Sequence, residues 1–248
     1  MEHTPNHRVV LITGAARRIG AAIARCLHAG GYDVALHYRH SATEAMALAA
    51  ELERQRAGST LTVAAELADL EQLPPLVEQV LDRFGRLDAL VNNASAFFPT
   101  ALSGATPAQW QTLFAANVQA PFFLAQSALP ALHSARGAIV NLVDIYAERP
   151  LAEHSLYCMT KAALAAMTRS LALDLAPAVR VNGVAPGAVL WPSDGKHHDD
   201  QQALLARTPL QRIGQPEDIA SAVLWLLRDA PFVTGQIIRV DGGRTLSV

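Results

Sequence analysis

The sequence predicts one α/β domain, a doubly wound, Rossmann-like parallel sheet with helices on both faces. The first observation is that strand-like and helix-like runs alternate along the whole chain. The second is that the strand-like runs are apolar at consecutive positions, which is typical of strands buried on both faces. The third is size, because 248 residues with 51% hydrophobic residues suit one large domain of this class. We therefore expect a single domain over residues 1–248.

Seven runs rich in β-branched and apolar residues predict the strands. They cover residues 8–13, 33–38, 61–64, 87–91, 138–143, 179–184 and 236–240. Because crossovers between parallel strands are right-handed, the carboxyl ends of these strands should share one edge of the sheet. Ligands of such folds bind at that edge, where the strand order reverses.

Capping and breaking residues mark the predicted helices. The helices cover residues 19–29, 73–84, 107–124 and beyond, 153–175 and 216–227, with one more after Ser41. Ser41 and Glu44 have the spacing of a capping box. Pro107 and Pro216 each open a helix, and Pro177 ends the one that begins at 153.

The most irregular part of the chain follows the sixth predicted strand. We interpret residues 188–210 as a substrate lid, because a polar loop of this length in a compact domain is usually functional. Trp191 in this segment either walls the pocket or anchors the loop. Residues 1–7 are polar and are expected to be flexible.

Composition argues against several other classes of protein. The formal net charge is -2 and no basic stripe is present, so no nucleic-acid partner is indicated. No apolar run is long enough for a membrane span, and no signal peptide is recognisable. Cys26 and Cys158 have no metal-ligand spacing, and two cysteines are too few for a disulfide framework. We expect a cytoplasmic protein without a metal, in which the histidines and aspartates at 197–200 are solvated.

A glycine-containing turn, Thr13-Gly-Ala-Ala-Arg-Arg-Ile-Gly20, follows the first predicted strand. Gly14 permits a tight turn, and Gly20 lets the next helix approach the sheet. The helix N-terminus near Ile19 then offers free N–H groups and a positive dipole to a pyrophosphate. Because the turn follows the first strand of an α/β chain, dinucleotide binding is favoured over an ordinary turn.

The turn resembles that of the short-chain dehydrogenase/reductase family, where Thr-Gly is followed by three residues, Gly or Ala, one residue and Gly. Arg18 stands at the middle small position, next to Arg17. The pteridine reductases, a branch of this family, have two basic residues in the same place. The resemblance implies that Arg18 pairs with phosphate oxygens and reaches into the active site.

The end of the second predicted strand indicates NADPH rather than NADH. NAD sites usually place Asp or Glu there to bind the ribose 2′-OH, but this strand ends Tyr38-Arg39-His40-Ser41. Arg39, His40 and the Ser41 hydroxyl suit a 2′-phosphate, and Arg17 adds a second guanidinium. Pteridine reductases have a similar His-Tyr-His-Arg-Ser segment, but Arg and His are exchanged, so which of the two contacts the phosphate stays open. The alternative is that both only solvate a loop.

The resemblance assigns further residues to the cofactor, although two of them depart from the wider family. Glu66 replaces the usual Asp, and Ser95 replaces a glycine, as it does in pteridine reductases. The full set is Glu66 and Leu67 beside the adenine, Asn93, Ala94 and Ser95 beside the adenosine ribose, and Pro186 and Gly187 before the lid.

Tyr157 and Lys161 are four residues apart in a long predicted helix and therefore share one face. A nearby ammonium favours a phenolate, so Lys161 is expected to lower the pKa of Tyr157 and to aid proton transfer. The pair matches the family's catalytic Tyr and Lys, whose Lys also holds the nicotinamide ribose. Asn117 matches the family's catalytic asparagine, with a buried or capping amide as the alternative.

Asp144 stands thirteen residues before Tyr157, where the family usually has serine and pteridine reductases have aspartate. A buried carboxyl group has a raised pKa and keeps a proton for a ring nitrogen. The resemblance also implies that Phe97 stacks on a pterin. The predicted substrate site comprises Arg18, Ser95, Phe97, Asp144, Tyr157 and Trp191.

The leading hypothesis is an NADPH-dependent pteridine reductase of folate metabolism, an oxidoreductase acting on C–N bonds. Its substrate would be a dihydropterin: dihydromonapterin, dihydrobiopterin or dihydrofolate. Which pterin is physiological, and whether fully oxidised pterins are reduced, stays open. The alternatives are a carbonyl reductase acting on a ketone and a non-catalytic NADPH-binding sensor. The closing motifs at 234–236 and 240–243 resemble those of the family and imply a homotetramer.

Overall fold

A computed structural model describes residues 7–189 and 198–246. Its centre is a seven-stranded parallel sheet in the order β3-β2-β1-β4-β5-β6-β7. The strands are β1 Arg8–Ile12, β2 Tyr32–Tyr38, β3 Thr60–Ala64, β4 Ala89–Asn92, β5 Ala138–Leu142, β6 Arg180–Pro186 and β7 Ile237–Val240. The order reverses between β1 and β4, which is the switch point of a doubly wound sheet. The predicted fold class is confirmed.

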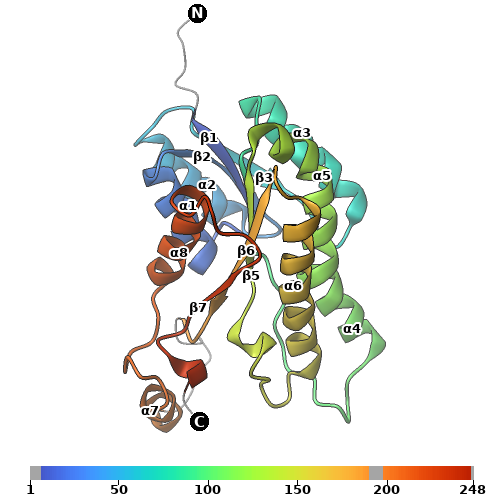
Figure 1. Ribbon diagram of the computed structural model, residues 1–248, viewed down its shortest axis with the longest axis vertical. Helices are drawn as coiled ribbons and strands as arrows, with labels where there is room; N and C mark the ends of the chain where they lie inside the picture. Colours follow the sequence, from blue (N-terminus) through green and yellow to red (C-terminus); the bar gives the residue numbers. More distant parts are fainter. Residues whose placement is uncertain (1–6, 190–197, 247–248) are drawn as a thin grey trace, which may run out of the picture.

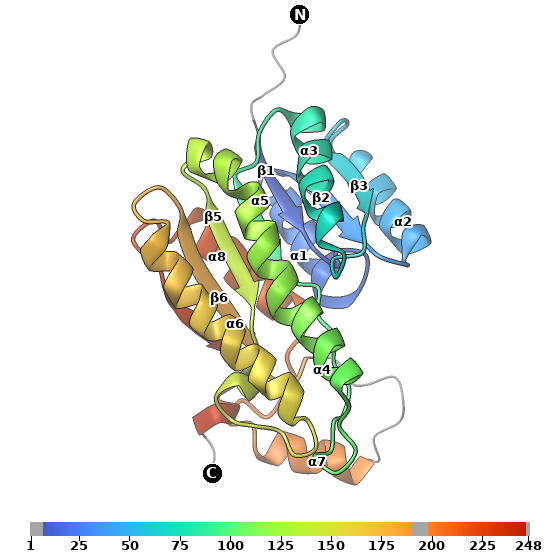
Figure 2. The same cartoon turned by 90° about the vertical axis from the view of Figure 1, so that its right-hand side faces the viewer.

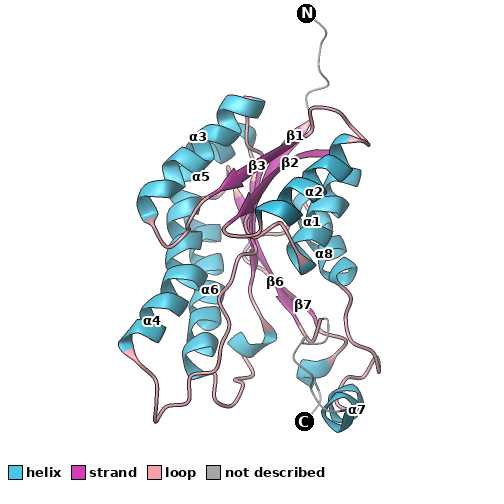
Figure 3. Ribbon diagram, turned by 180° about the vertical axis from the view of Figure 1, so that it is seen from behind, coloured by secondary structure: helices cyan, strands magenta, loops and turns pink. Residues whose placement is uncertain are grey.

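Helices cover both faces of the sheet (Figures 1 and 2). One face carries α1 Arg18–Ala29, α2 Ala42–Glu53 and α8 Pro216–Arg228, and the other carries α3 Leu73–Phe84, α5 Ala120–Ala135 and α6 Ser155–Asp174. Figure 3 shows the same layers from behind, with α4 (Pro107–Phe114) and α7 (His198–Ala206) at one end of the molecule. Short 3-10 turns are η1 Leu70–Gln72, η3 Ile145–Ala147 and η4 Arg244–Leu246.

Alternate residues of a strand pack into different layers of the core. In β1, Val10 and Ile12 join the cluster beneath α1 and α8, whereas Val9 and Leu11 join the cluster beneath α3 and α5. All four are buried, which explains why the strand sequences are apolar at consecutive positions. A sheet packed on both sides gives rigid support to the loops at its carboxyl edge.

One predicted local feature is wrong, and one predicted helix contains an irregular turn. Ser41 precedes α2 but its side chain makes no cap hydrogen bond, and Glu44 lies near Arg17 instead, so the capping box is absent. The helix that begins at Pro107 is interrupted by a π-helical turn, η2 (Ala115–Gln119), before α5. Predicted ends of the other paired elements fall within two residues of the observed ones.

The predicted lid and N-terminus are described only in part. Residues 190–197, with Trp191, and residues 1–6 lie outside the described residues. The remainder of 188–210 contains α7, which was not predicted because its sequence begins His-Asp-Asp-Gln-Gln without an apolar stripe. No helix in the described part of the chain is long and apolar enough to cross a membrane.

Candidate active site

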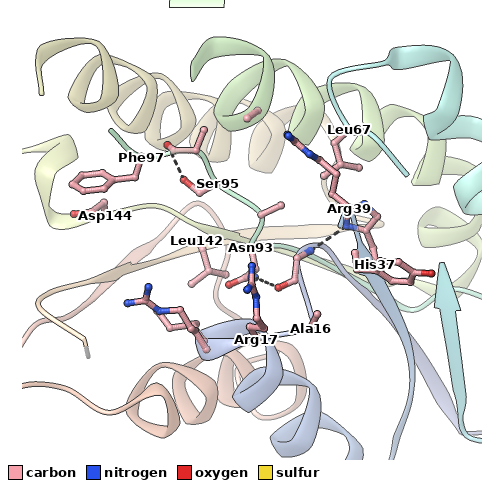
Figure 4. Close-up of a pocket in the computed structure, with 18 of the residues that line it drawn as sticks. Ala16, Arg17, His37, Arg39, Leu67, Asn93, Ser95, Phe97, Leu142 and Asp144 are labelled. Carbon is pink, nitrogen blue, oxygen red and sulfur yellow. Dashed lines mark hydrogen bonds between the residues drawn. The ribbon is translucent and has the colours of Figure 1, made fainter. Parts of the chain in front are cut away.

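A cavity of about 660 Å³ opens at the carboxyl ends of the strands. Figure 4 shows Phe97 and Asp144 at one end of it and Arg39 at the other. The cavity brings together most of the predicted site residues: Gly14, Arg17, Arg18, Ile19, Gly20, Tyr38, Arg39, His40, Ser41, Glu66, Leu67, Asn93, Ala94, Ser95, Phe97, Asp144, Tyr157, Lys161, Pro186 and Gly187. Asn117 is not among the lining residues. An elongated cavity of this kind suits a dinucleotide with a substrate at one end.

In the turn after β1, the positions of Gly14 and Gly20 have no room for a side chain. Gly14 has a φ of 61°, and a Cβ on Gly20 would overlap the Gly14 carbonyl and lie 2.7 Å from Asn93 Nδ2. Asn93 Nδ2 donates to the carbonyl oxygens of Thr13 and Gly14, at 2.8 and 3.0 Å. The Asn93 side chain therefore shapes the turn, and the N-terminus of α1 lies at the cavity, where its free N–H groups could bind an anionic group.

Arg18 has left-handed backbone geometry, with a φ of 53°. A residue with a side chain is strained by about 1 kcal/mol in this left-handed geometry. The resembling family usually has a small residue at this position. The Arg18 side chain is exposed and lines the cavity. A strained arginine at a cavity wall indicates a functional role.

At the end of the cavity next to β2, two arginines are paired with two glutamates, and the sequence analysis did not anticipate these ion pairs. Arg39 Nε lies 2.6 Å from His40 Nε2 and 3.2 Å from a Glu66 carboxylate oxygen. Arg17 lies 3.6 Å from Glu44. These exposed ion pairs contribute little stability, so a 2′-phosphate can replace the acids as the partner of both arginines.

The Tyr157 hydroxyl donates to Asp144 Oδ2 at 2.8 Å, and the Tyr146 N–H donates to Asp144 Oδ1 at 2.9 Å. Tyr157 lies on α6, and Asp144 follows β5 at the start of η3. Lys161, one turn further along α6, donates from Nζ to the Leu142 carbonyl at 2.8 Å. The fold thus joins the predicted tyrosine, lysine and aspartate at the end of one strand.

Burial controls the acid–base properties of this group. It raises the pKa of Asp144, outweighing the Tyr146 N–H and Tyr157 hydroxyl, which lower it. It also raises the pKa of Tyr157, and the Asp144 charge and hydrogen bond raise it further. The expectation that Lys161 lowers the Tyr157 pKa is therefore wrong, because burial and the nearby Asp144 both raise it. Burial thus favours the protonated form of both Asp144 and Tyr157.

Burial lowers the pKa of Lys161 to about 8, although the Asp144 charge opposes this. Between about pH 8 and pH 10, unfolded lysine binds a proton that folded Lys161 has lost. The free energy of unfolding of the apoprotein should therefore rise over that window, by on the order of 1 kcal/mol per pH unit. Lys161→Met should abolish this slope in urea unfolding, and equal slopes in the two proteins would contradict the lowered pKa.

Asn117 lies in the π-helical turn and is 1% exposed. Its Oδ1 accepts from the Ser95 hydroxyl and the Ala96 N–H, at 3.0 and 2.8 Å. Its Nδ2 donates to the Ala96 carbonyl and to Thr160 Oγ1, at 2.9 and 3.0 Å. Asn117 therefore ties the loop after β4 to α6, the helix of Tyr157, and its side chain acts as a positioning amide.

Phe97 is 55% exposed beside Tyr157, with the two ring centroids 4.7 Å apart in an edge-on arrangement. The His154 ring stacks on Phe97 at 4.8 Å. Phe97 lines the cavity, whereas His154 is not among the lining residues. Sequence reasoning missed His154, whose spacing from Tyr157 places it one turn earlier. Phe98 is partly buried and packs against the core cluster that contains Tyr157.

Gly187 lies against the closing Val-Asp-Gly-Gly motif. Its N–H donates to the Val240 carbonyl at 3.0 Å, and a Cβ there would lie 2.7 Å from Asp241 Cα. The motif therefore shapes the wall of the cavity after β6. Within residues 7–189 and 198–246, no group of three or more His, Cys, Asp or Glu residues is placed to hold a metal ion.

Comparison with known proteins agrees with this geometry. Residues 14–245 match the family described as Enoyl-(Acyl carrier protein) reductase. The chain is 37% identical to "Pteridine reductase 1" of Leishmania tarentolae, over 100% of this chain and 99% of that protein. The chain belongs to the short-chain dehydrogenase/reductase family. As a member of this family it is an oxidoreductase that uses a nicotinamide cofactor.

Other relatives of this short-chain dehydrogenase/reductase have different names. It is 37% identical to "Granaticin polyketide synthase putative ketoacyl reductase 2" of Streptomyces violaceoruber, over 98% of both chains. It is 35% identical to the 3-oxoacyl-(acyl-carrier-protein) reductase FabG of Staphylococcus aureus, over 94% of this chain and 96% of that protein. Overall similarity thus establishes the reaction family, and the choice of substrate depends on individual residues.

Proposed function

We propose that the chain is an NADPH-dependent pteridine reductase that converts a dihydropterin to its tetrahydro form. The hydrogen bond between Tyr157 and Asp144 carries this proposal. A carboxyl group with a raised pKa supplies a proton to a ring nitrogen, which a serine hydroxyl does far less readily.

The residues of the cavity fit NADPH. The bare glycine turn and the N-terminus of α1 suit the pyrophosphate. Arg17 and Arg39, with His40 and Ser41, suit the 2′-phosphate, and no carboxylate follows β2 directly. When bound, the cofactor supplies a hydride.

The chain's own residues move the proton. For this step the bond between the two side chains runs the other way, from a protonated Asp144 Oδ2 to the Tyr157 oxygen. Asp144 then passes its proton to the Tyr157 oxygen while the Tyr157 proton goes to the ring nitrogen. With one hydride on the neighbouring carbon, the C=N bond becomes CH–NH, and Asp144 is left ionised until water protonates it again. Lys161, whose charge is buried beside this pair, holds the nicotinamide ribose and offsets the charge on Asp144.

The residues around Phe97 orient a flat ring. Phe97, which lines the cavity and stacks against His154, also stacks on the pterin in this proposal. Arg18 and Ser95 contact the polar edge of the ring. The partners are small pterin or folate molecules, and the assembly is a cytoplasmic homotetramer.

A ketone-reducing enzyme is the second candidate, because two of the relatives carry ketoacyl reductase names. Loss of NADPH absorbance with dihydrobiopterin, dihydrofolate and a panel of ketones separates the two. We expect consumption with a dihydropterin, faster than with any ketone and faster with NADPH than with NADH. Absence of turnover with every pterin would overturn the proposal, and absence of turnover with all substrates would favour a sensor.

Arg18→Gly should weaken pterin binding without unfolding the protein. Relief of the left-handed strain and the added freedom of the unfolded glycine chain nearly cancel, each being about 1 kcal/mol. Loss of the guanidinium should raise KM for the pterin about tenfold. Steady-state kinetics and thermal unfolding measure the two effects. Arg18→Lys, which keeps the charge, should fall in between, and an unchanged KM in Arg18→Gly would rule out substrate contact.

A further inference from the structure

His37 lies in β2 beneath the glycine turn and is 2% exposed. Its Nδ1 is 3.1 Å from the Gly14 N–H nitrogen, and its Nε2 is 3.1 Å from the Ala65 carbonyl oxygen. Its own carbonyl accepts from the Ala15 N–H at 2.8 Å. Figure 4 shows the ring at the Arg39 end of the cavity. One residue thus joins the turn after β1 to the end of β3.

These partners define the protonation state of the ring. The Gly14 N–H can only donate, so Nδ1 must be the acceptor. The Ala65 carbonyl can only accept, so Nε2 must carry the proton. The ring is therefore neutral, with its proton on Nε2. A protonated ring would turn a second N–H group toward the Gly14 N–H in a buried place, which removes a hydrogen bond and leaves two donors facing each other.

We propose that His37 is a positioning residue for the dinucleotide, whose neutral ring holds the glycine turn in its phosphate-binding shape and releases it on protonation. The proposal rests on the cofactor site described above and adds a residue to it that touches the turn rather than the chemistry. Asn93 holds the same turn from the opposite side, through the Gly14 carbonyl. His37 is the hydrogen-bond acceptor for the N–H of the same residue, Gly14.

Burial and the nearby carboxylate act on the pKa of His37 in opposite directions. Glu66, which follows β3 next to Ala65, favours the protonated ring, and burial disfavours it more strongly, so the pKa of His37 is lowered. Arg17 and Arg18 on the turn and Arg39 after β2 line the same cavity and add positive charge. Release of the turn is therefore confined to acid conditions, where the affinity for NADPH should fall.

The test is NADPH binding by calorimetry, without any pterin, for wild type, His37→Gln and His37→Leu. Glutamine has an acceptor and a donor and does not titrate, so it should bind NADPH nearly as well as wild type at neutral pH. Leucine has neither, and its affinity should be about tenfold lower. Between about pH 7.5 and pH 5, wild type should lose more affinity than His37→Gln, and the titration of the 2′-phosphate cancels in this comparison.

His28→Gln is the matched control, because His28 is also a buried histidine with a lowered pKa but bonds to Ser59 away from the cavity. It should leave both NADPH affinity and its pH dependence unchanged. Wild-type affinity in His37→Leu would overturn the inference, and so would parallel pH profiles for wild type and His37→Gln. If His37→Leu fails to fold, the pH dependence of NADPH affinity in His37→Gln tests the inference by itself. Failure of wild type itself to bind NADPH would instead overturn the proposed function.

Discussion

Asp144→Asn is expected to lower kcat for a dihydropterin by about a hundredfold or more, while the Kd for NADPH changes by less than about twofold. The asparagine amide keeps the size of the side chain and a hydrogen bond to the Tyr157 hydroxyl, but it has no proton to give. The loss should therefore appear in kcat rather than in KM. Stopped-flow NADPH oxidation at saturating pterin measures it directly.

The dependence of turnover on pH is the control for this prediction. In wild type, turnover should fall as pH rises through the raised pKa of Asp144, because the proton that it donates is lost. Asp144→Asn should lack that descending limb. Full activity in the variant, or the same descending limb in both proteins, would show that Asp144 does not supply the proton.

Tyr157→Phe is expected to lower kcat by about a thousandfold or more with every substrate, pterin or ketone. The hydroxyl is the last proton-bearing atom before the substrate, and its bond to Asp144 is the link in the relay. NADPH binding should persist, because the ring and Lys161 stay in place. Steady-state kinetics with calorimetric binding separates the two effects.

Tyr32→Phe is the matched control for loss of a buried tyrosine hydroxyl, because Tyr32 is buried at the opposite end of β2. It should keep wild-type kcat. Residual turnover of Tyr157→Phe within about tenfold of wild type would mean that another group protonates the substrate.

The fold was predictable because its determinants are local and repeated. Most strands contain runs of consecutive apolar residues, and prolines and glycines mark where several helices begin and end. The features that failed depend on tertiary context. Ser41 has the right sequence for a cap, but its backbone geometry directs the side chain elsewhere. The π-helical turn around Asn117 depends on contacts with Ala96 and Thr160, which are distant in sequence.

The site was predictable where a motif carries the geometry, as in the turn from Gly14 to Gly20 and in the pair Tyr157 and Lys161. The raised pKa of Asp144 was also predicted from its expected burial, but the raised pKa of Tyr157 was not. The sequence indicates a cation near Tyr157 but not that Asp144 is closer and raises the tyrosine pKa. His154 could have been found from its spacing to Tyr157. The contacts of His37 cross from β2 to two other strands and need the folded sheet.

The most direct test of the proposed function is the ratio of kcat/KM for dihydrobiopterin to kcat/KM for a 3-oxoacyl thioester, in wild type and in Asp144→Ser. Serine is the usual family residue at this position, so this change tests whether one side chain sets the substrate class. We predict a wild-type ratio far above one and a fall of at least about tenfold in Asp144→Ser. A wild-type ratio below one, or the same ratio in both proteins, would contradict the assignment of this site to pterin reduction.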